Sequence, residues 1–259
     1  MVKNYYFLVP SLPPLSLREK PEITFEKLAT LLEIGLTKQD LHETKVLRLF
    51  VDIANIRALL LEEPIDERGN LSEKELDEAL LLKNILPEYV FDFLNPFEKA
   101  SDRLKNFSGV LSLYFSKEIA AASGFLKSYL EFERASRLVL LALRAKQMGR
   151  DVAGELQFED LTDPLVLQIL AQKDALSYDP PEEYRELKER VASCFGDPWL
   201  ENSVFAEYRF QRIDEIAAHS SLFGIDQILA YMAKLFIVEY FFELEEERGK
   251  RVIDTFKTG

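Results

Sequence analysis

The chain has 259 residues, 47% of them hydrophobic and 30% charged, so it is long enough to bury a core and its composition is not that of a disordered tail. The formal net charge of −13 opposes binding to nucleic acid or to an anionic lipid surface and favours a basic partner. Glycine (10) and proline (11) are scarce, which argues against a turn-rich all-β fold. The single cysteine, Cys194, excludes an internal disulfide framework and fits a reducing compartment.

The first residues predict a short extended arm. Residues 4–9 read Asn-Tyr-Tyr-Phe-Leu-Val, an aromatic and β-branched content that is typical of extended chain. The prolines at 10, 13 and 14 then predict a non-helical path, because the residue before a proline avoids the α region. Lys3 is followed by only a short apolar run, so we expect no signal peptide, and we expect no membrane span anywhere in the sequence.

Apolar periodicity and capping residues predict helices along the rest of the chain. Thr24 is the expected N-cap of a first helix that ends at Gly35, and Thr37 starts the next. Ser72 followed by Glu75 is typical of a capping box. The expected spans in this part of the chain are about 24–35, 38–62, 72–86 and 88–94.

Longer helices are predicted further on. Residues 98–122 and 124–149 contain no proline, and Gly109 and Gly124 are expected bends. Asp-Pro and Pro-Pro pairs open three more helices, at about 164–172, 181–194 and 198–219. The last helix, about 226–256, is apolar in its first half and charged in its second. We therefore expect the first half to be buried and the second to be exposed.

Together these elements predict an all-α protein. We expect an elongated multi-helix body made of helical lobes, for which a pseudo-threefold arrangement is one interpretation, with a short extended proline-rich N-terminal arm. The prediction is a single body over residues 1–259, with lobes at 1–96, 97–160 and 161–259.

The sequence offers little for catalysis or metal binding. His42 and His219 are the only histidines, so a zinc site built from histidine and cysteine is nearly excluded. Glu215 and His219 lie four residues apart, which is also the spacing of an ordinary helical polar pair. No glycine-rich phosphate loop and no nucleophile elbow is present. We expect no catalytic residue, no metal and no cofactor.

Three predicted helices share a local pattern. Residues 49–60, 129–146 and 240–251 each contain an aromatic or apolar stretch, then an acidic residue, then basic residues one or two turns later. The order of acidic before basic residues also suits an isolated helix, so the pattern alone is only modestly specific.

The segment Asp52-x-x-Asn55-Ile56-Arg57 resembles the repeated helix of the C-type (also called d-type) subunit of V/A-type ATPases. The opening segment Tyr5–Leu17 and the closing segment Phe241–Lys250 resemble a bacterial family whose members are encoded among the V-type ATPase subunits. The resemblance implies three related helical lobes around a funnel, and a non-catalytic part that joins the central shaft to the membrane rotor ring. The chain is shorter than a typical subunit of that type, and the proline-rich arm replaces the helix that opens those proteins.

We expect this chain to lie in the cytoplasm, peripheral to the inner membrane, with the shaft subunits and rotor ring as partners and with no nucleic acid. A funnel lined by acidic helix ends would suit a basic shaft. The residues expected to meet a partner are an acidic set and an aromatic set: Asp52, Glu133, Glu245 and Glu246, and Tyr5, Tyr6 and Phe7.

Other interpretations remain open at this point. The acidic residues could form a solvated rim of ordinary helical pairs. The protein could be a helical adaptor or scaffold that is unrelated to the ATPase. It could also be an apolar-ligand-binding protein or an enzyme, with an aromatic pocket lined by Phe125, Phe132 and Phe236. An aromatic stripe at helical spacing is more often part of a core.

Overall fold

The computed structural model describes residues 3–258, with side chains described from Lys3 to Arg248. Within these residues it contains thirteen α-helices, one short 3-10 helix and no strand, which confirms the all-α prediction. The chain divides into two compact units, one made of the residues up to Thr44 together with those from Glu189 on, the other of Lys45–Lys188. This division differs from the lobes expected from the sequence, because helices near the two ends of the chain pack on each other.

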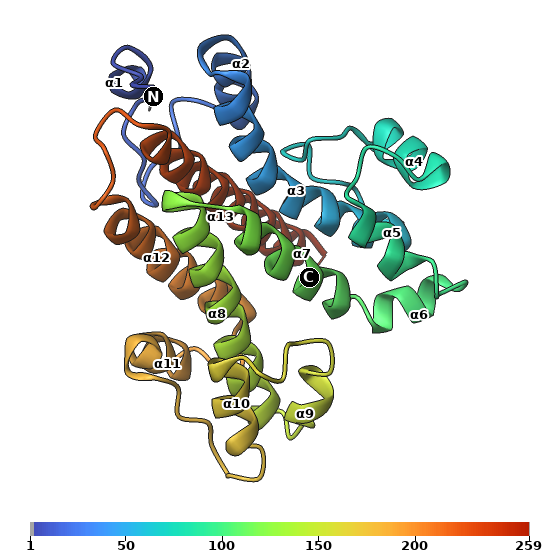
Figure 1. Ribbon diagram of the computed structural model, residues 1–259. Helices are drawn as coiled ribbons and strands as arrows, with labels where there is room; N and C mark the ends of the chain where they lie inside the picture. Colours follow the sequence, from blue (N-terminus) through green and yellow to red (C-terminus); the bar gives the residue numbers. More distant parts are fainter. Residues whose placement is uncertain (1–2, 259) are drawn as a thin grey trace. The chain divides into compact units, whose positions relative to one another are not determined.

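The first unit is built around a helical hairpin. Helices α12 (Pro198–Ala217) and α13 (Ile225–Thr258) lie side by side and antiparallel, and α2 (Phe25–Gly35) packs on α13 (Figure 1). The rings of Phe25 and Phe236 stack with centroids 4.5 Å apart. The N–H of Phe25 also donates to the Glu239 carboxylate at 2.7 Å. Most residues of α13 from Ile228 to Val238 are buried, as the apolar sequence predicts.

The second unit is organised by helices α7 (Ser108–Ala121) and α8 (Gly124–Gln147), which pack together. Helix α5 (Glu88–Leu94) packs on α7, and the short helices α9 (Val152–Glu155) and α10 (Pro164–Ala171) pack on α8 (Figure 1). The buried hydroxyl of Tyr114 donates to the carbonyl of Val46 at 3.0 Å. The remaining elements are α1 (Leu8–Ser11), α3 (Lys38–Leu60), α4 (Glu73–Leu82), α6 (Ala100–Lys105), the 3-10 helix η1 (Glu182–Tyr184) and α11 (Arg185–Ala192).

Helix starts were the most accurate sequence predictions. Thr24 caps α2, and Ser72 and Glu75 form a complete capping box at α4. Asp163 caps α10 and Asp197 caps α12, each with proline at the first helical position. No helix among the described residues combines the length and apolar character needed to cross a bilayer.

Two local predictions were wrong. The proline-rich arm contains a helical turn, α1, which includes Pro10; proline is tolerated there because the first N–H groups of a helix have no partner inside it. The predicted helix 98–122 breaks at Asn106 and Phe107 instead of bending at Gly109. Gly109 allows close packing, since a Cβ there would stand 3.0 Å from Phe93 and 3.2 Å from Phe158.

The buried face of α13 gives a first prediction. Leu229 is fully buried, whereas Leu222 in the preceding loop is 74% exposed. Leu229→Ala should lower the free energy of unfolding by about 2–5 kcal/mol, because it removes buried methyl groups and leaves a cavity. Leu222→Ala should change it by less than about 0.5 kcal/mol. Urea unfolding followed by circular dichroism measures both, and equal losses would contradict the assignment of the buried face.

Candidate functional site

Helix α3 carries a polar cluster that holds the loop between α3 and α4. The carboxylate of Asp52 accepts hydrogen bonds from the side chain of Asn70 at 2.7 Å and from the N–H of Leu71 at 3.1 Å. One turn further on, the Asn55 amide donates to the carbonyl of Asp66 and accepts from its N–H, both at 2.8 Å. These bonds fix the loop over residues 66–71 on the helix.

Gly69 lies tightly against this cluster. A Cβ at this position would stand 2.5 Å from an Asp52 carboxylate oxygen and 3.1 Å from Nδ2 of Asn55. Arg48, one turn before Asp52, donates to the carbonyl oxygens of Arg68 and Gly69. The helix thus supplies partners for backbone groups of the loop, which a buried loop requires.

Asp52 is 1% exposed, so the expectation that it belongs to an exposed acidic surface is wrong. Helical spacing shows which residues share a face, but it does not show that a loop folds back over that face. Burial raises the pKa of the Asp52 carboxyl, and the hydrogen bonds from Asn70 and Leu71 offset this rise only in part.

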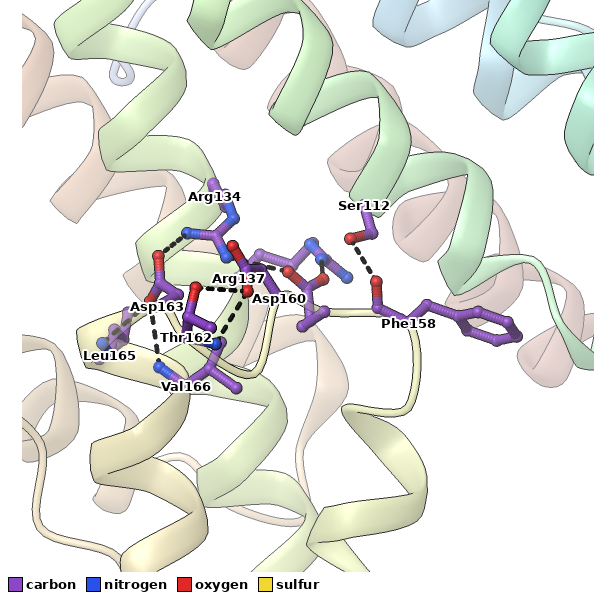
Figure 2. Close-up of polar contacts among 10 residues, drawn as sticks. Ser112, Arg134, Arg137, Phe158, Asp160, Thr162, Asp163, Leu165 and Val166 are labelled. Carbon is purple, nitrogen blue, oxygen red and sulfur yellow. Dashed lines mark hydrogen bonds and ion pairs between the residues drawn. The ribbon is translucent and has the colours of Figure 1, made fainter.

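A second cluster lies on α8 and was not predicted (Figure 2). Nη1 of Arg134 lies 2.8 Å from Asp163, and its Nη2 lies 3.1 Å from Glu159. Arg137 pairs with the other carboxylate oxygen of Glu159, and its guanidinium lies 5.7 Å from the centroid of the Phe115 ring. The buried Glu159 carboxylate is therefore held between two arginines. Two arginines three residues apart on one helix were the available sequence signal.

Further hydrogen bonds hold the loop between α9 and α10, which contains Glu159 and Asp163. The second oxygen of Asp163 accepts from the N–H groups of Leu165 and Val166 at the start of α10, and Asp160 accepts from the N–H and hydroxyl of Thr162 (Figure 2). Ser112 of α7 donates to the carbonyl of Phe158 at 2.8 Å. The loop that leads to α10 is thus tied to both long helices of the second unit.

Charge in the α8 cluster is balanced by pairing. Burial lowers the pKa of the Arg137 guanidinium. Burial acts in the same direction on Arg134, but Asp163 and Glu159 outweigh it, so the pKa of Arg134 is raised. Arginines do not exchange protons near neutral pH, so these two side chains hold the loop through permanent positive charges.

The acidic residues expected at a partner surface differ in exposure. Glu245 and Glu246 on α13 are exposed, as predicted, and Glu246 forms an ion pair with Lys20. Glu133 on α8 is half-buried. Glu133 and the α13 residues belong to different units, so their meeting at a common opening stays a prediction.

The aromatic residues of the arm have two different roles. Tyr5 is 5% exposed, so the expectation that it is free to meet a partner is wrong. Its N–H donates to the carbonyl of Phe223 at 2.7 Å and its hydroxyl donates to Asp40, which anchors the arm to the start of α3 and the α12–α13 loop. Tyr6 is 59% exposed and Phe7 93% exposed.

Tyr6, Phe7 and Leu222 are exposed apolar residues that we name the aromatic patch. The ring of Tyr6 lies 5.0 Å from that of Phe223, which adjoins Leu222 in the chain. The patch therefore joins the arm to the α12–α13 loop. Exposed apolar residues that gather in this way are typical of interaction surfaces.

The residues considered for metal binding do not form a ligand set. Among the side chains from Lys3 to Arg248, no three His, Cys, Asp or Glu groups are placed to hold a metal ion. Cys194 is buried and its thiol donates to the carbonyl of Arg190 at 3.1 Å. His42 and His219 are exposed, and Glu215 bonds to Gln211 and Arg212.

Of the three phenylalanines expected to line an aromatic pocket, Phe125 and Phe132 are buried in the second unit, and Phe236 is half-buried in the first. Phe125 stacks on Tyr129 with centroids 5.7 Å apart, and Phe132 is buried in the same helix. Phe236 stacks on Phe25 in the first unit. Such ring contacts are common in helical packing.

Fold and surface thus define an all-helical protein whose long helices clamp their neighbouring loops and whose arm presents an exposed aromatic patch. The chain belongs to the family described as protein of unknown function (DUF2764), whose model matches residues 2–259. It is 28% identical over 264 residues to a protein of Chlamydia muridarum, covering 100% of this chain and 99% of that protein. It is 26% identical to a protein of Chlamydia trachomatis over 260 residues, covering 98% and 97%. Both relatives carry the name "Uncharacterized protein". No solved structure matches significantly.

The raised pKa of Asp52 predicts a pH dependence. A carboxyl whose pKa is raised by folding stabilises the protein fully below its unfolded pKa, and this contribution is lost as the pH rises through the folded value. Wild type should therefore lose stability relative to Asp52→Asn as the pH rises from about 3 to 7. Urea titrations of both proteins at a series of pH values measure this difference.

Asp160 is the matched control, because hydrogen bonds from Thr162 lower its pKa. Its contribution is present above the unfolded pKa and is lost as the pH falls. Wild type should therefore gain stability relative to Asp160→Asn over the same rise in pH. A gain in the stability of wild type relative to Asp52→Asn as well would show that the burial of Asp52 has no electrostatic cost.

The α8 cluster predicts strong energetic coupling. Glu159→Ala should lower the free energy of unfolding by about 3 kcal/mol, because it leaves two partly buried guanidinium groups without this carboxylate. A double-mutant cycle of Glu159→Ala with Arg137→Ala should give a coupling energy above about 1 kcal/mol. The exposed pair Arg185–Glu182 is the control, with an expected coupling below about 0.5 kcal/mol. Similar coupling energies for the two pairs would show that the α8 cluster does not hold the loop more strongly than an exposed ion pair does.

Proposed function

We propose that the protein is a non-catalytic structural and coupling component of a V/A-type rotary ATPase, in which it links the central shaft to the membrane rotor ring. The support comes from the resemblance of the segments Tyr5–Leu17 and Phe241–Lys250 to a bacterial family encoded among the V-type ATPase subunits. The proposed location is the cytoplasmic face of the inner membrane, where the membrane sector of the ATPase supplies the contact with lipid.

One structural observation carries the proposal: the two segments that bear the resemblance are also segments with exposed side chains. Tyr6 and Phe7 project from the arm, and Glu245 and Glu246 lie exposed on α13. Exposed side chains contribute little to the hydrophobic core, so a distinctive sequence at these positions points to recognition more than to folding.

The two segments suit two different parts of a docking process. Acidic side chains attract a basic shaft at long range and speed its association, an effect that salt weakens. An exposed aromatic pair supplies short-range apolar contact, and aromatic residues dominate the binding energy of many interfaces. Tyr5, the buried residue of the arm, preorganises the adjacent aromatic pair for binding.

Capture of the tagged full-length chain from native membranes, read by mass spectrometry, tests the proposal. Wild type should retain shaft and rotor subunits of the ATPase. Replacing Tyr6 and Phe7 together by serine should weaken retention by roughly 30-fold, equivalent to about 2 kcal/mol. Leu176→Ser, which alters a fully exposed leucine far along the sequence, should leave retention unchanged. Absence of ATPase subunits from the wild-type sample would overturn the proposal.

The acidic residues are tested separately by kinetics with the purified shaft subunit. Glu245→Lys combined with Glu246→Lys should slow association and flatten its dependence on salt. Asp174→Lys combined with Glu183→Lys makes the same change in net charge at exposed sites elsewhere and should leave the rate near that of wild type. Equal rates for the two double variants would show that α13 is not the acidic contact.

A further inference from the structure

The second unit contains a pocket between the end of α3 and helices α4, α5 and α6. Its volume is about 230 Å³. A cavity of about 150 Å³ holds a benzene molecule, so this pocket can take a hydrocarbon group of about six carbons and still leave room for a small polar group. Apolar side chains that line a pocket in this way bind the hydrocarbon part of a ligand. The apolar lining consists of Ile56, Leu59, Leu60, Leu80, Phe91 and Leu94.

Three polar side chains of the lining, Lys83, Asn95 and Arg103, can donate hydrogen bonds to a ligand. Lys83 donates to the side-chain oxygen of Asn95 at 2.7 Å, which leaves the NH2 group of that amide to donate. Nε of Arg103 donates to the carbonyl of Phe97 at 2.9 Å, which leaves its two Nη groups for a further partner. Among the residues whose side chains are described, neither Lys83 nor Arg103 forms an ion pair. An ammonium, a guanidinium and an amide NH2 group together suit a carboxylate.

The charges of the lining favour a ligand with a single negative charge. Lys83 and Arg103 are cations and Asp77 is the one anion, so one positive charge is in excess. Asp77 precedes Lys83 by six residues, about 9 Å along the helix, so its carboxylate lies apart from the donors. A monocarboxylate balances the excess charge. A phosphate monoester, with a charge of about −1.5 to −2, exceeds it and is repelled more strongly by a chain of net charge −13.

Backbone strain is concentrated around the same pocket. Among the described residues, three that are not glycine have positive φ: Glu62 (57°), Lys83 (53°) and Ile85 (68°). Glu62 follows the lining residue Leu60 by two positions, and Ile85 follows Lys83 by two. Such strain costs free energy and gathers at ligand-binding sites. A left-handed residue at the end of a helix is usually glycine, so the lysine at this position is retained at a cost in stability.

We propose that this pocket binds an aliphatic monocarboxylate. The hydrocarbon group of the ligand packs against the apolar lining, and its carboxylate accepts hydrogen bonds from Lys83, Asn95 and Arg103. A neutral aliphatic ligand would fill the same space but would leave the two cations without a counter-charge. This inference is independent of the proposed ATPase role, because it concerns a different part of the chain and its tests use the purified protein alone.

Titration of the full-length chain with sodium hexanoate, followed by NMR, tests the ligand class. Hexanoate should bind at least about tenfold more tightly than 1-hexanol or hexylamine, because only the carboxylate pairs with the two cations. Equal binding of the three compounds, or binding of none, would overturn the proposal. N-acetylleucine distinguishes the source of the carboxylate. Tighter binding of hexanoate indicates a free acid, tighter binding of N-acetylleucine indicates the C-terminal residue of a peptide, and both results support the proposed chemistry.

The role of Arg103 is tested by Arg103→Gln. This change should weaken hexanoate binding at least about tenfold and leave the binding of 1-hexanol unchanged, because it removes a charged donor and keeps the apolar lining. Lys105→Gln is the matched control, since it makes the same change in net charge on the same helix at an exposed residue that does not line the pocket. Equal effects of the two substitutions on hexanoate binding would overturn the proposal.

The role of Lys83 is tested by Lys83→Gly. Glycine adopts positive φ without strain, so the melting temperature of the unliganded protein should rise, while hexanoate binding should weaken about fivefold or more because the ammonium group is gone. Ile85→Gly is the matched control. It relieves strain in the same loop, but Ile85 does not line the pocket, so the melting temperature should rise and hexanoate binding should stay as in wild type. A Lys83→Gly variant that binds hexanoate as wild type does would overturn the proposed site.

Discussion

The structure depends on one constraint: polar groups of the loops that pack on the long helices need partners, and in this chain side chains of those helices supply them. Asp52 and Asn55 on α3 hold the loop before α4, and Arg134 and Arg137 on α8 hold the loop before α10. In both cases two polar side chains three residues apart bind a loop that ends in a capped helix. Because α4 and α10 are too short to be stable alone, their positions follow from these clamps and from the apolar faces that pack beneath them.

Both polar clusters, on α3 and on α8, contain a buried carboxylate, and burying a charge costs desolvation free energy. Asp52 is a buried anion that is stabilised mainly by neutral donors, and its raised pKa records the incomplete compensation. Glu159 is also buried but lies between two guanidinium groups, so its charge is compensated by pairing. An apolar side chain at either position would pack without that cost. The charged residues instead make the packing of the loop specific. A carboxylate or a guanidinium forms good hydrogen bonds only when its partners in the loop have the matching geometry.

Local signals in the sequence predicted where the helices lie. They did not predict the burial of individual side chains, which depends on contacts between segments that are distant in the sequence. Thr24 and Ser72 were identified as caps, and the Asp163-Pro164 pair as a helix start, because these signals depend on neighbouring residues alone. Burial of Asp52 and Tyr5 was missed because it depends on a loop about 18 residues later and on Phe223, far along the chain. The exposure of Glu245 and Glu246 was anticipated, since it required only that the charged end of α13 lie outside the core.

The exposed apolar residues of this chain are not equivalent, and the difference lies in how they are held. A single exposed leucine such as Leu176 is common on protein surfaces and has no specific support. Phe7, by contrast, lies in an arm that the buried Tyr5 anchors. Ile85 is exposed at the centre of a turn whose positive φ is unfavourable for a β-branched residue. Anchoring reduces the entropy lost on binding, and strain is retained only where the surroundings or a partner offset it. A strongly acidic surface keeps such exposed residues soluble. Anchoring at Tyr5 and the positive φ at Ile85 thus distinguish these two exposed features from a single exposed leucine.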